Sequence, residues 1–532
     1  MNIVEVLKTQ AKELPESVAL MEPKRRNIGS FTFSEIESAS SRAAASLAQA
    51  GLCTGDTVLV FQPMSTDLYI ALLAIFQLKL VAVFIDPSAG RSHIDRCCKL
   101  ISPKAMIATP KAHVLQLLSP ALRRIPTKFS TGFRLPGTKP WSRWKQCPRN
   151  RNIEPCEHNT PALITFTSGS TGEPKVAVRT HGFLLAQQRV LAKELSLSHA
   201  DKVLSTLPIF ILSHLGSGVT SIMPDADLRR PGFIDAGPVV RQIQKYKVTN
   251  IEASPAFFER IVRYCHVHHI TLPGLKKILT GGGPVFPRLL DQLQNLAPNA
   301  EIVAVYGSTE AEPIAQISRD AMDGKDKQSM TSGKGLLAGQ PIKDIHLRII
   351  PDRWGSPLAP LSRSQFEALC LPPGEVGEIV VAGDHVLPGY WRGRGNPETK
   401  FKVSEAIWHR TGDAGYLDRD GRLWLLGRCI ARIEDQRGIL YPFAVESAVS
   451  QYPNIRRSAC VAYANQRTLA IELEHPAASK DIAALKAKLS WAAIDRIVVL
   501  KRIPVDPRHN AKIDYPALNA LLKKFSENNQ HK

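Results

Sequence analysis

Residues 162–183 read ALITFTSGSTGEPKVAVRTHGF, an apolar run that leads directly into a turn of small residues. Lys175 follows three residues after the last glycine of this turn. Small residues let successive backbone N–H groups converge on an anion, hydroxyl groups add donors, and a lysine brings a point charge to a polyphosphate. The pattern predicts a strand and then a phosphate-binding loop. The residues of this loop are Thr167, Ser168, Gly169, Ser170, Thr171 and Gly172.

The loop differs from the Walker motif, in which GxxxxGK is followed by Ser or Thr. A cluster of small residues is also typical of a linker. The loop alone therefore leaves two alternatives, a linker and a nucleoside triphosphate site, and the rest of the chain decides between them.

Around this loop, short apolar runs rich in β-branched residues alternate with helical patterns through the first four fifths of the chain. The alternation is typical of βαβ units and predicts an α/β fold with mostly parallel sheets. Beyond about residue 370 the apolar runs are closely spaced, and Asp420-Gly421 between two of them predicts a hairpin turn. The expected strands are Thr57 to Phe61, Val81 to Ile85, Ala162 to Phe166, Val203 to Leu207 and Ile302 to Tyr306, and the expected helices include Ser34 to Ala50 and Pro238 to Tyr246.

The length and composition are those of a globular protein with more than one domain. A chain of 532 residues exceeds what one hydrophobic core usually supports, and 44% hydrophobic with 22% charged residues excludes a disordered or membrane-embedded class. The most apolar stretch, Leu68 to Ile85, is interrupted by Gln77 and Lys79, so we expect a buried helix followed by a strand. The nine cysteines form no CxxC pair, which indicates a reducing cytoplasm and argues against a zinc site.

The chain is strongly basic, with a formal net charge of +20. Much of this charge is local, because nine Lys and Arg residues and no Asp or Glu fall between Val114 and Ile153. Such a run usually forms a solvated surface loop, which is the expectation here. A nucleic-acid-binding protein is the alternative, because Phe129, Phe133, Trp141 and Trp144 lie between the cations. No RRM, KH or helix-turn-helix signature accompanies them, so a nucleic-acid partner is disfavoured.

The string TSGSTGEPK after a strand resembles the phosphate loop of the adenylate-forming superfamily, which comprises acyl-CoA synthetases, peptide-synthetase adenylation domains and luciferases. Further segments resemble the family's motifs in the same order over nearly the whole chain. They are Gly281-Gly282-Gly283-Pro284, Tyr306-Gly307-Ser308-Thr309-Glu310, Gly377-Glu378-Ile379, Pro388-Gly389-Tyr390-Trp391, Thr411-Gly412-Asp413, Gly427-Arg428 and the tail from Pro504 to Lys512. The resemblance implies a large N-terminal domain with parallel-rich sheets and a distorted barrel, residues 1–426, and a small mobile α+β C-terminal domain, residues 427–532.

The resemblance also implies that several of these motifs bind ATP. The phosphate loop and Lys175 would surround the phosphates. Gly282 and Gly283 would lie against the adenine, because glycine lets the backbone approach a planar base closely. Tyr306, beside Gly307, would stack on the same base.

The remaining motifs imply the catalytic groups and the sugar site. Thr309 would meet a phosphate, and Glu310 would help to hold Mg²⁺, a hard cation that prefers oxygen ligands. Asp413 would accept hydrogen bonds from the ribose hydroxyls, and Arg428 would support the same sugar. Lys512 would neutralise the charge that builds on the reacting oxygens, which is commonly the largest catalytic contribution. The expected catalytic residues are therefore Lys512, Thr309 and Glu310, and Glu310 is the expected metal ligand.

The reaction that the family shares converts a carboxylic acid and Mg·ATP into acyl-AMP and pyrophosphate. We expect a fatty acid as the substrate, ATP and Mg²⁺ as cofactors, and a second step that forms a thioester with CoA. Two alternatives for the second step stay open. The acyl group could pass to an acyl carrier protein, or the 3-hydroxyl of a 3-hydroxy acyl-AMP could close a β-lactone without CoA.

Two departures from the family pattern make thioester formation with CoA less secure and bring the lactone alternative close behind it. Ala431 stands where the family usually has a hinge acid, and Ile211 stands where many acyl-CoA synthetases have a histidine. His214 lies three residues later and is expected to be a packing or capping residue, because a base must come within hydrogen-bond reach of a substrate proton. These departures, with the run LPIFILSHLGSGVTSIMPD and the tail PVDPRHNAKI, resemble the olefin β-lactone synthetase branch of the family.

The segment from Ala517 to Phe525 has an amphipathic pattern. It is expected either to make peripheral contact with a membrane or to pack against the rest of the chain.

Overall fold

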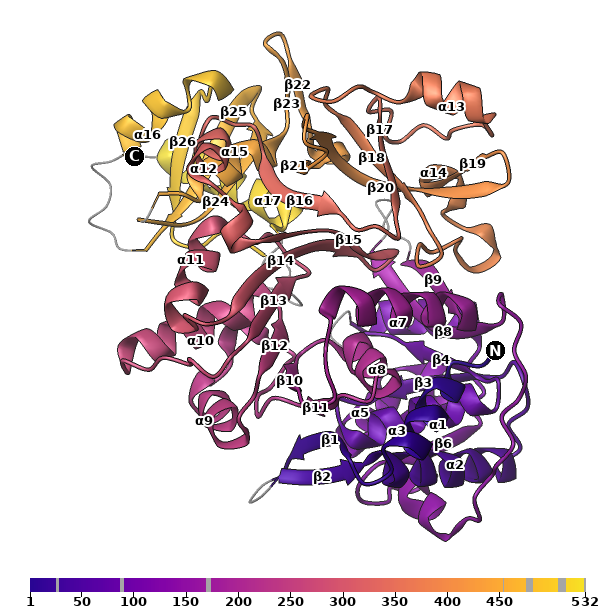
Figure 1. Cartoon of the computed structure of the whole chain (residues 1–532). Helices are drawn as coiled ribbons and strands as arrows, with labels where there is room; N and C mark the ends of the chain where they lie inside the picture. The colour runs from indigo at the N-terminus through magenta and orange to yellow at the C-terminus, as the bar shows by residue number, and fades with distance from the viewer. Residues whose placement is uncertain are drawn as a thin grey trace. The chain divides into compact units, whose positions relative to one another are not determined.

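The computed structural model describes residues 1–24, 28–86, 90–168, 174–452, 454–474, 482–505 and 513–530 (Figure 1). The chain forms two compact units. Unit 1 contains Met1–Asp225, Thr309–Glu312 and Asp384–Pro397, and unit 2 contains Ala226–Ser308, Pro313–Gly383 and Glu398–Lys532. This division differs from the expected boundary after residue 426, which stays a prediction.

Unit 1 is built on parallel strands, as the alternating pattern predicts. Its main sheet has the order β7-β6-β5-β3-β4-β8-β9, in which the pairing of β8 with β9 is antiparallel. A second set of strands has the order β10-β11-β1-β2 and is parallel except for β1 with β2. The strands are β1 (Val18–Pro23), β2 (Ile28–Thr32), β3 (Thr57–Phe61), β4 (Val81–Phe84), β5 (Ala105–Ala108), β6 (Thr127–Ser130), β7 (Lys139–Pro140), β8 (Pro161–Ser168), β9 (Pro174–Thr180), β10 (Lys202–Ser205) and β11 (Thr220–Ile222).

The helices of unit 1 begin at residues that cap them. Thr32 and Glu35 form a capping box at the start of α2, and Ser65 accepts a hydrogen bond from the N–H of Leu68 at the start of α3. The helices are α1 (Val4–Glu13), α2 (Phe33–Gln49), α3 (Thr66–Gln77), α4 (Arg91–Ile101), α5 (Pro110–His113), α6 (Pro120–Arg123), α7 (His181–Leu195) and α8 (Pro208–Gly216).

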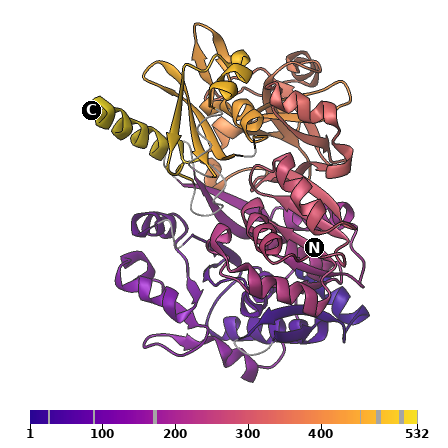
Figure 2. The same ribbon diagram turned by 90° about the vertical axis from the view of Figure 1, so that its left-hand side faces the viewer.

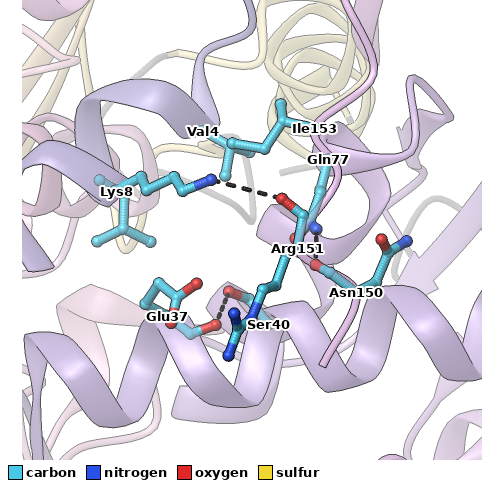
Figure 3. A pocket seen from close by; sticks show the side chains of 9 residues that line it. Val4, Lys8, Glu37, Ser40, Gln77, Asn150, Arg151 and Ile153 are labelled. Atoms are coloured by element: carbon cyan, nitrogen blue, oxygen red, sulfur yellow. Dashed lines mark hydrogen bonds between the residues drawn. The ribbon is translucent and has the colours of Figure 1, made fainter. Parts of the chain in front are cut away.

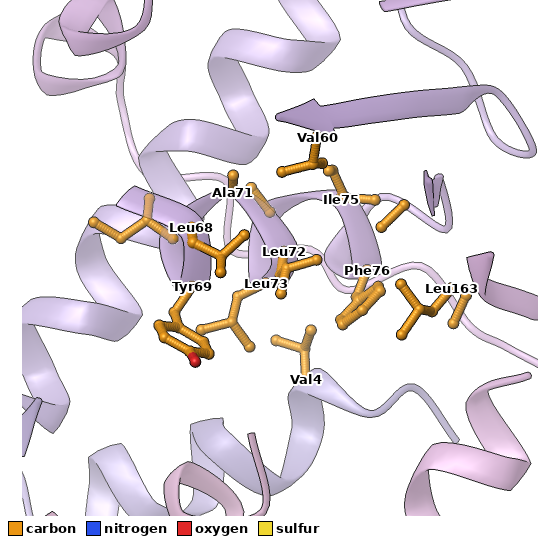
Figure 4. Close-up of a cluster of buried hydrophobic side chains, with 14 of the residues drawn as sticks. Val4, Val60, Leu68, Tyr69, Ala71, Leu72, Leu73, Ile75, Phe76 and Leu163 are labelled. Atoms are coloured by element: carbon orange, nitrogen blue, oxygen red, sulfur yellow. The ribbon is translucent and has the colours of Figure 1, made fainter. Parts of the chain in front are cut away.

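Helix α3 lies at the centre of the largest core cluster of unit 1 (Figure 4). Eleven of its twelve residues are buried, so it is surrounded by protein on every face. Figure 4 shows Val60 of β3 on one side of the helix and Val4 of α1 on the other. Each large apolar side chain buried in this way stabilises the fold by about 1.5–3 kcal/mol. Within the described residues, we find no helix with both the length and the apolar character needed to cross a membrane.

The basic segment 114–153 is a solvated surface loop only in part. It contributes the adjacent strands β6 and β7, and the rings of Phe129 and Trp141 pack edge to face in the core, 5.8 Å apart. Hydrogen bonds also fix the end of the segment, because the backbone carbonyl oxygen of Asn150 accepts from Gln77 Nε2 and from Ser41 Oγ, both at 2.5 Å. Figure 3 shows Gln77 and Asn150 beside a small cavity that is also lined by Val4 and Lys8 of α1. Most of its cationic side chains are exposed, so the charge is solvated although the backbone is ordered.

Unit 2 combines a parallel set of strands with a larger antiparallel set. Strands β12, β13 and β14 are parallel neighbours, and the order β17-β18-β20-β21-β16 is antiparallel throughout. The antiparallel set stands where the resemblance implies a distorted barrel. Gly421, with a φ of +75°, lies in the turn between β20 and β21, where the hairpin was expected.

The strands of unit 2 are β12 (Asn250–Ala253), β13 (Lys277–Gly281), β14 (Glu301–Ser308), β16 (Leu336–Pro341), β17 (His346–Ile350), β18 (Gly377–Ala382), β19 (Lys400–Val403), β20 (Ala406–Leu417), β21 (Leu423–Arg428), β22 (Ile433–Asp435), β23 (Gly438–Leu440), β24 (Ile455–Tyr463), β25 (Gln466–Leu473) and β26 (Arg496–Leu500). Its helices are α9 (Ala236–Tyr246), α10 (Pro255–Val267), α11 (Pro287–Leu296), α12 (Gly324–Thr331), α13 (Arg363–Leu369), α15 (Pro442–Val449), α16 (Ile482–Lys488) and α17 (Tyr515–Gln530). β15 (Ala311–Ser318) and α14 (Asn396–Thr399) contain residues of both units.

The last hundred residues of unit 2 form the sheet β24-β25-β26 with α15, α16 and α17 (Figure 2). Leu518 and Leu522 of α17 are buried against side chains of that sheet, among them Val461 and Val498. The amphipathic segment 517–525 was expected either to contact a membrane or to pack against the rest of the chain. The apolar side chains that the structure describes, Leu518 and Leu522, pack against the chain.

Candidate active site

Lys175, Tyr390 and Glu310 meet in unit 1. The Tyr390 hydroxyl donates a hydrogen bond of 2.8 Å to Glu310 Oε1, and the Leu387 N–H donates one of 2.7 Å to the Glu310 carbonyl oxygen. Lys175 Nζ lies over the Tyr390 ring, 5.8 Å from its centroid. The structure thus brings together Lys175 and Glu310, two of the charged residues that the motifs singled out, one from β9 and one from the turn before β15. Tyr390, to which the sequence analysis gave no role, joins them.

Arg179 is a buried cation behind the same turn, and the sequence interpretation missed it. Its side chain is 8% exposed, and its Nη2 donates a hydrogen bond of 2.9 Å to the carbonyl oxygen of Thr309. Nη1 lies 3.5 Å from Thr165 Oγ1. Burial lowers the pKa of the guanidinium, whereas the carboxylates of Glu312 and Glu310 raise it. The signal was a single arginine inside the apolar strand VAVRTH, where an unpaired charge would be strongly unfavourable.

Tyr306, Asp413 and Arg428 meet in unit 2. The Tyr306 hydroxyl donates a hydrogen bond of 2.7 Å to Asp413 Oδ2, and Arg428 Nε lies 3.2 Å from Asp413 Oδ1. Burial, followed by the charge of Asp413, holds the pKa of Tyr306 well above its usual value. Strand pairing explains the meeting, because Asp413 on β20 is the direct partner of Arg428 on β21. The Asp413 side chain remains 16% exposed, so its carboxylate can still be reached by a hydroxyl group.

The glycine turn follows β13. Gly282 has a φ of +79°, a conformation that favours glycine, and a Cβ added to Gly281 would lie 2.8 Å from the Val305 carbonyl oxygen. Both positions therefore require glycine for local reasons, and Gly283 follows them. A contact of Gly282 and Gly283 with adenine stays a prediction, as do the roles of Tyr306 and Gly307.

Part of the predicted site lies outside the described residues. The structure describes β8 up to Ser168 and β9 from Pro174, paired antiparallel, so the predicted loop does connect two strands. Gly169, Ser170, Thr171 and Gly172 lie outside the described residues, as do the side chains of Thr167 and Ser168. Lys512 also lies outside them. The residues that flank its segment meet, because Val505 and Ile513 form an antiparallel bridge.

His214 has the packing role that its sequence context predicts. It lies in α8, the helix that begins at Pro208, and is 1% exposed. Its Nδ1 is 2.9 Å from Ser221 Oγ. Ile211, at the position where relatives have histidine, is fully buried in the core.

The donor set fits a shared magnesium ion better than a protein-only metal site. Within the described residues, no three His, Cys, Asp or Glu side chains converge in a way that could hold a metal. Glu310 Oε1 accepts a hydrogen bond from the Tyr390 hydroxyl, and the carboxylate offers the oxygen donors that a hard cation prefers. Mg²⁺ usually takes one or two protein carboxylates and completes its shell with water and substrate phosphates, so this arrangement fits it.

Comparisons with known proteins identify the family of the chain. A family model described as "AMP-binding enzyme" matches residues 7–391. An olefin beta-lactone synthetase of Stenotrophomonas maltophilia (strain K279a) is 30% identical, with 96% of each chain covered. An indoleacetate–CoA ligase of Aromatoleum aromaticum (strain DSM 19018 / LMG 30748 / EbN1) is 30% identical, over 60% of this chain and 57% of its own.

A crystal structure of an anthranilate CoA ligase in complex with anthranoyl-AMP has the same fold. Its TM-score is 0.83, and it covers 99% of this chain and 98% of its own at 16% identity. The family model spans more than half of the chain, and the lactone synthetase matches it from end to end. The protein therefore belongs to the AMP-binding enzyme family and is an adenylate-forming, acid-activating ligase.

Proposed function

We propose that the protein activates a 3-hydroxy fatty acid as its acyl-AMP and then closes that intermediate to a β-lactone. The observation that carries this choice is the end-to-end similarity to an olefin beta-lactone synthetase, with 96% of both chains aligned. The free cysteines of the chain fit a reducing cytoplasm as its place of action.

In the first step, a carboxylate oxygen of the acid attacks the α-phosphorus of ATP, and pyrophosphate leaves. Lys175 brings a positive charge to the phosphates, beside Glu310 and Tyr390. Mg²⁺, held by Glu310, would offset the charge of the leaving pyrophosphate. Thr309 would donate to a phosphate oxygen, with its backbone carbonyl fixed by Arg179. Lys512 would neutralise the reacting oxygens, a role that rests on its motif.

The adenosine would be held by the residues that the motifs imply for the sugar and the base. Asp413 would accept hydrogen bonds from the two ribose hydroxyls, since its two oxygens suit a vicinal diol. Arg428 and Tyr306 already orient this carboxylate from both sides. The phosphate loop of residues 167–172 would contact the triphosphate in the way that its motif implies.

In the second step, the 3-hydroxyl oxygen forms a bond to the activated carbonyl carbon, the bond to AMP breaks, and the hydroxyl proton is released. No thiol enters this reaction. An attacking group on the same molecule can have an effective concentration of about 10⁵ to 10⁸ M, so ring closure does not require a second substrate.

The hinge supports this proposal. Ala431 lacks the usual acid, and the next residue is tied down, because Arg432 Nη1 lies 3.0 Å from Asp352 Oδ1. Tyr441 donates to the other oxygen of Asp352 over 2.9 Å. Many relatives rotate the small domain about this hinge to form a thioester, a step that lactone closure does not need.

Thioester formation is the second candidate, because relatives such as the indoleacetate–CoA ligase are named for CoA. Transfer of the acyl group to an acyl carrier protein belongs to the same candidate. Either thiol would attack the acyl-AMP carbonyl and release AMP, and any acid without a 3-hydroxyl would serve.

The test uses a 3-hydroxy fatty acid and the matched acid without the hydroxyl, each with ATP, with and without CoA. Pyrophosphate release reports the first step, and AMP release with product mass reports the second. We expect the hydroxy acid to give AMP and a product one water lighter than the acid, without CoA. AMP release that requires CoA, with both acids, contradicts lactone closure. Pyrophosphate release from neither acid contradicts the fatty-acid assignment.

A further inference from the structure

Four large apolar side chains in one 20-residue stretch of unit 1 are more than half exposed. They are Val114 at 55%, Leu117 at 75%, Leu118 at 59% and Phe133 at 68%. Single exposed apolar residues are ordinary, but a group of them marks an interaction surface.

The four residues share one edge of the main sheet of unit 1. Strands β5 and β6 are parallel neighbours, so the segments that follow them leave at the same edge. α5 and residues 114–118 follow β5, and Phe133 follows β6. The two segments touch, because His113 Nε2 is 2.9 Å from the Phe129 carbonyl oxygen and a Cβ on Gly132 would lie 3.6 Å from Pro110.

The same region has a large excess of positive charge. No Asp or Glu occurs between Asp95 and Glu154, whereas this stretch has thirteen Lys and Arg residues, a net charge of +13 within the chain total of +20. Two of the cations, both exposed, lie within the two segments that carry the apolar side chains. They are Lys111 and Arg134.

We propose that this basic-apolar edge, residues 110–118 and 131–134, docks on an anionic lipid surface. Leu117 and Phe133 enter the interface, and Lys111 and Arg134 face the lipid phosphates. Cations around exposed aliphatic and aromatic side chains are the composition of an interfacial anchor. A nucleic acid would instead need several stacking aromatics, and of the four that lie between the cations Phe129 and Trp141 are buried, Trp144 is half-buried and Phe133 alone is exposed. A protein surface carries charges of both signs, whereas a stretch with thirteen cations and no acid matches the uniform negative charge of an anionic bilayer.

The test is co-sedimentation of the full chain with phosphatidylcholine vesicles, with and without phosphatidylserine. We expect binding only to the anionic vesicles, weakened by salt. Lys111→Gln with Arg134→Gln should weaken it about five-fold per charge. Leu117→Ser with Phe133→Ser should abolish most of it. The matched control is Val267→Ser with Ile439→Ser, two other exposed apolar residues at 64% and 56%, which should bind as the parent does.

Equal vesicle binding by the Leu117/Phe133 variant and the parent would overturn the proposal, as would equal binding to neutral vesicles. If the chain binds RNA or an acidic protein and does not bind vesicles, the surface belongs to that partner, and the lipid proposal is overturned as well. Pyrophosphate release with a short, water-soluble acid should be the same in every variant, which shows that each one folds. Because vesicle binding is measured without ATP, it can fail or succeed independently of the proposed reaction.

Discussion

Arg179 Nη2 donates a hydrogen bond of 2.9 Å to the backbone carbonyl oxygen of Thr309, and so ties the strand after the phosphate loop to the turn that carries Glu310. The guanidinium is buried and lies 5.8 Å from the centroid of the Phe183 ring. A turn fixed in this way would keep the carboxylate of Glu310 in place before substrate arrives, as preorganised catalysis requires.

Arg179→Met should lower kcat/KM for pyrophosphate release by about ten- to a hundredfold. The reason is that a buried carbonyl left without its partner loses about 1–3 kcal/mol. Arg179→Lys should recover only part of this, since an ammonium group lacks the planar fork of donors with which the guanidinium faces Thr309 and Thr165. Arg189→Met, on the exposed face of α7, is the control. Equal activity of the Met variant and the parent would remove Arg179 from the site.

Tyr390→Phe should raise the Mg²⁺ concentration needed for half-maximal activity about tenfold. The variant keeps the ring under Lys175 but removes the hydrogen bond to Glu310, and a bond to a charged group contributes about 1.5–3 kcal/mol. Tyr246→Phe is a matched control, because Lys245 Nζ lies 5.4 Å from the centroid of that ring. A magnesium titration of pyrophosphate release checks both, and an unchanged midpoint in Tyr390→Phe contradicts the role given to Glu310.

Asp413→Asn should weaken ATP binding at least about tenfold, because it removes the charge that Arg428 faces and one acceptor for the ribose. The substitution should also lower the pKa of Tyr306. Burial is the largest cause that raises this pKa, and the charge of Asp413 is the next largest. Equilibrium dialysis with ATP measures the first effect, and absorbance titration of the phenol measures the second. Asp344→Asn, at an exposed position, should change neither. Retained ATP affinity in Asp413→Asn would place the ribose elsewhere.

Glu446 should make the unit 2 core less stable as pH rises from about 4.5 to about 7. Burial raises its pKa from 4.5 to about 7, although the Cys460 N–H and the Tyr515 hydroxyl donate to Oε1 and lower it. In this range the folded chain keeps a proton that the unfolded chain has lost, so stability falls with increasing pH, by at most about 3 kcal/mol.

The measurement is the thermal unfolding midpoint between pH 5 and pH 8 for the parent and Glu446→Gln. The glutamine cannot ionise, so the difference between the two curves should change through this range and level off above it. Glu434→Gln, at a side chain that is 68% exposed, should follow the parent. A constant difference between Glu446→Gln and the parent would show that Glu446 does not titrate there.

Local patterns predicted the strands and the hairpin turn well. The run Thr57 to Phe61 forms β3 with the same bounds, and Asp420-Gly421 lies in the turn between β20 and β21. These features depend on residues that are close in sequence, such as a β-branched run or a glycine with positive φ.

Features that depend on burial were predicted less well. The basic segment 114–153 looked like a loop because of its charge, but Phe129 and Trp141 pack in the core. The amphipathic segment 517–525 fitted both a membrane and a protein partner, and a periodic apolar face alone does not say what covers it. Only the neighbouring sheet identifies its partner.

The sequence by itself determined the α/β class and the strand that leads into the predicted phosphate loop. It also identified Lys175, Glu310, Asp413 and Arg428 as candidate site residues, because all of these follow from short patterns and motifs. Only the tertiary structure placed Arg179 under Thr309 and the Tyr390 hydroxyl on Glu310. Those partners are 130 and 80 residues apart in the chain, and their contact depends on strand order and side-chain packing, which no local spacing encodes.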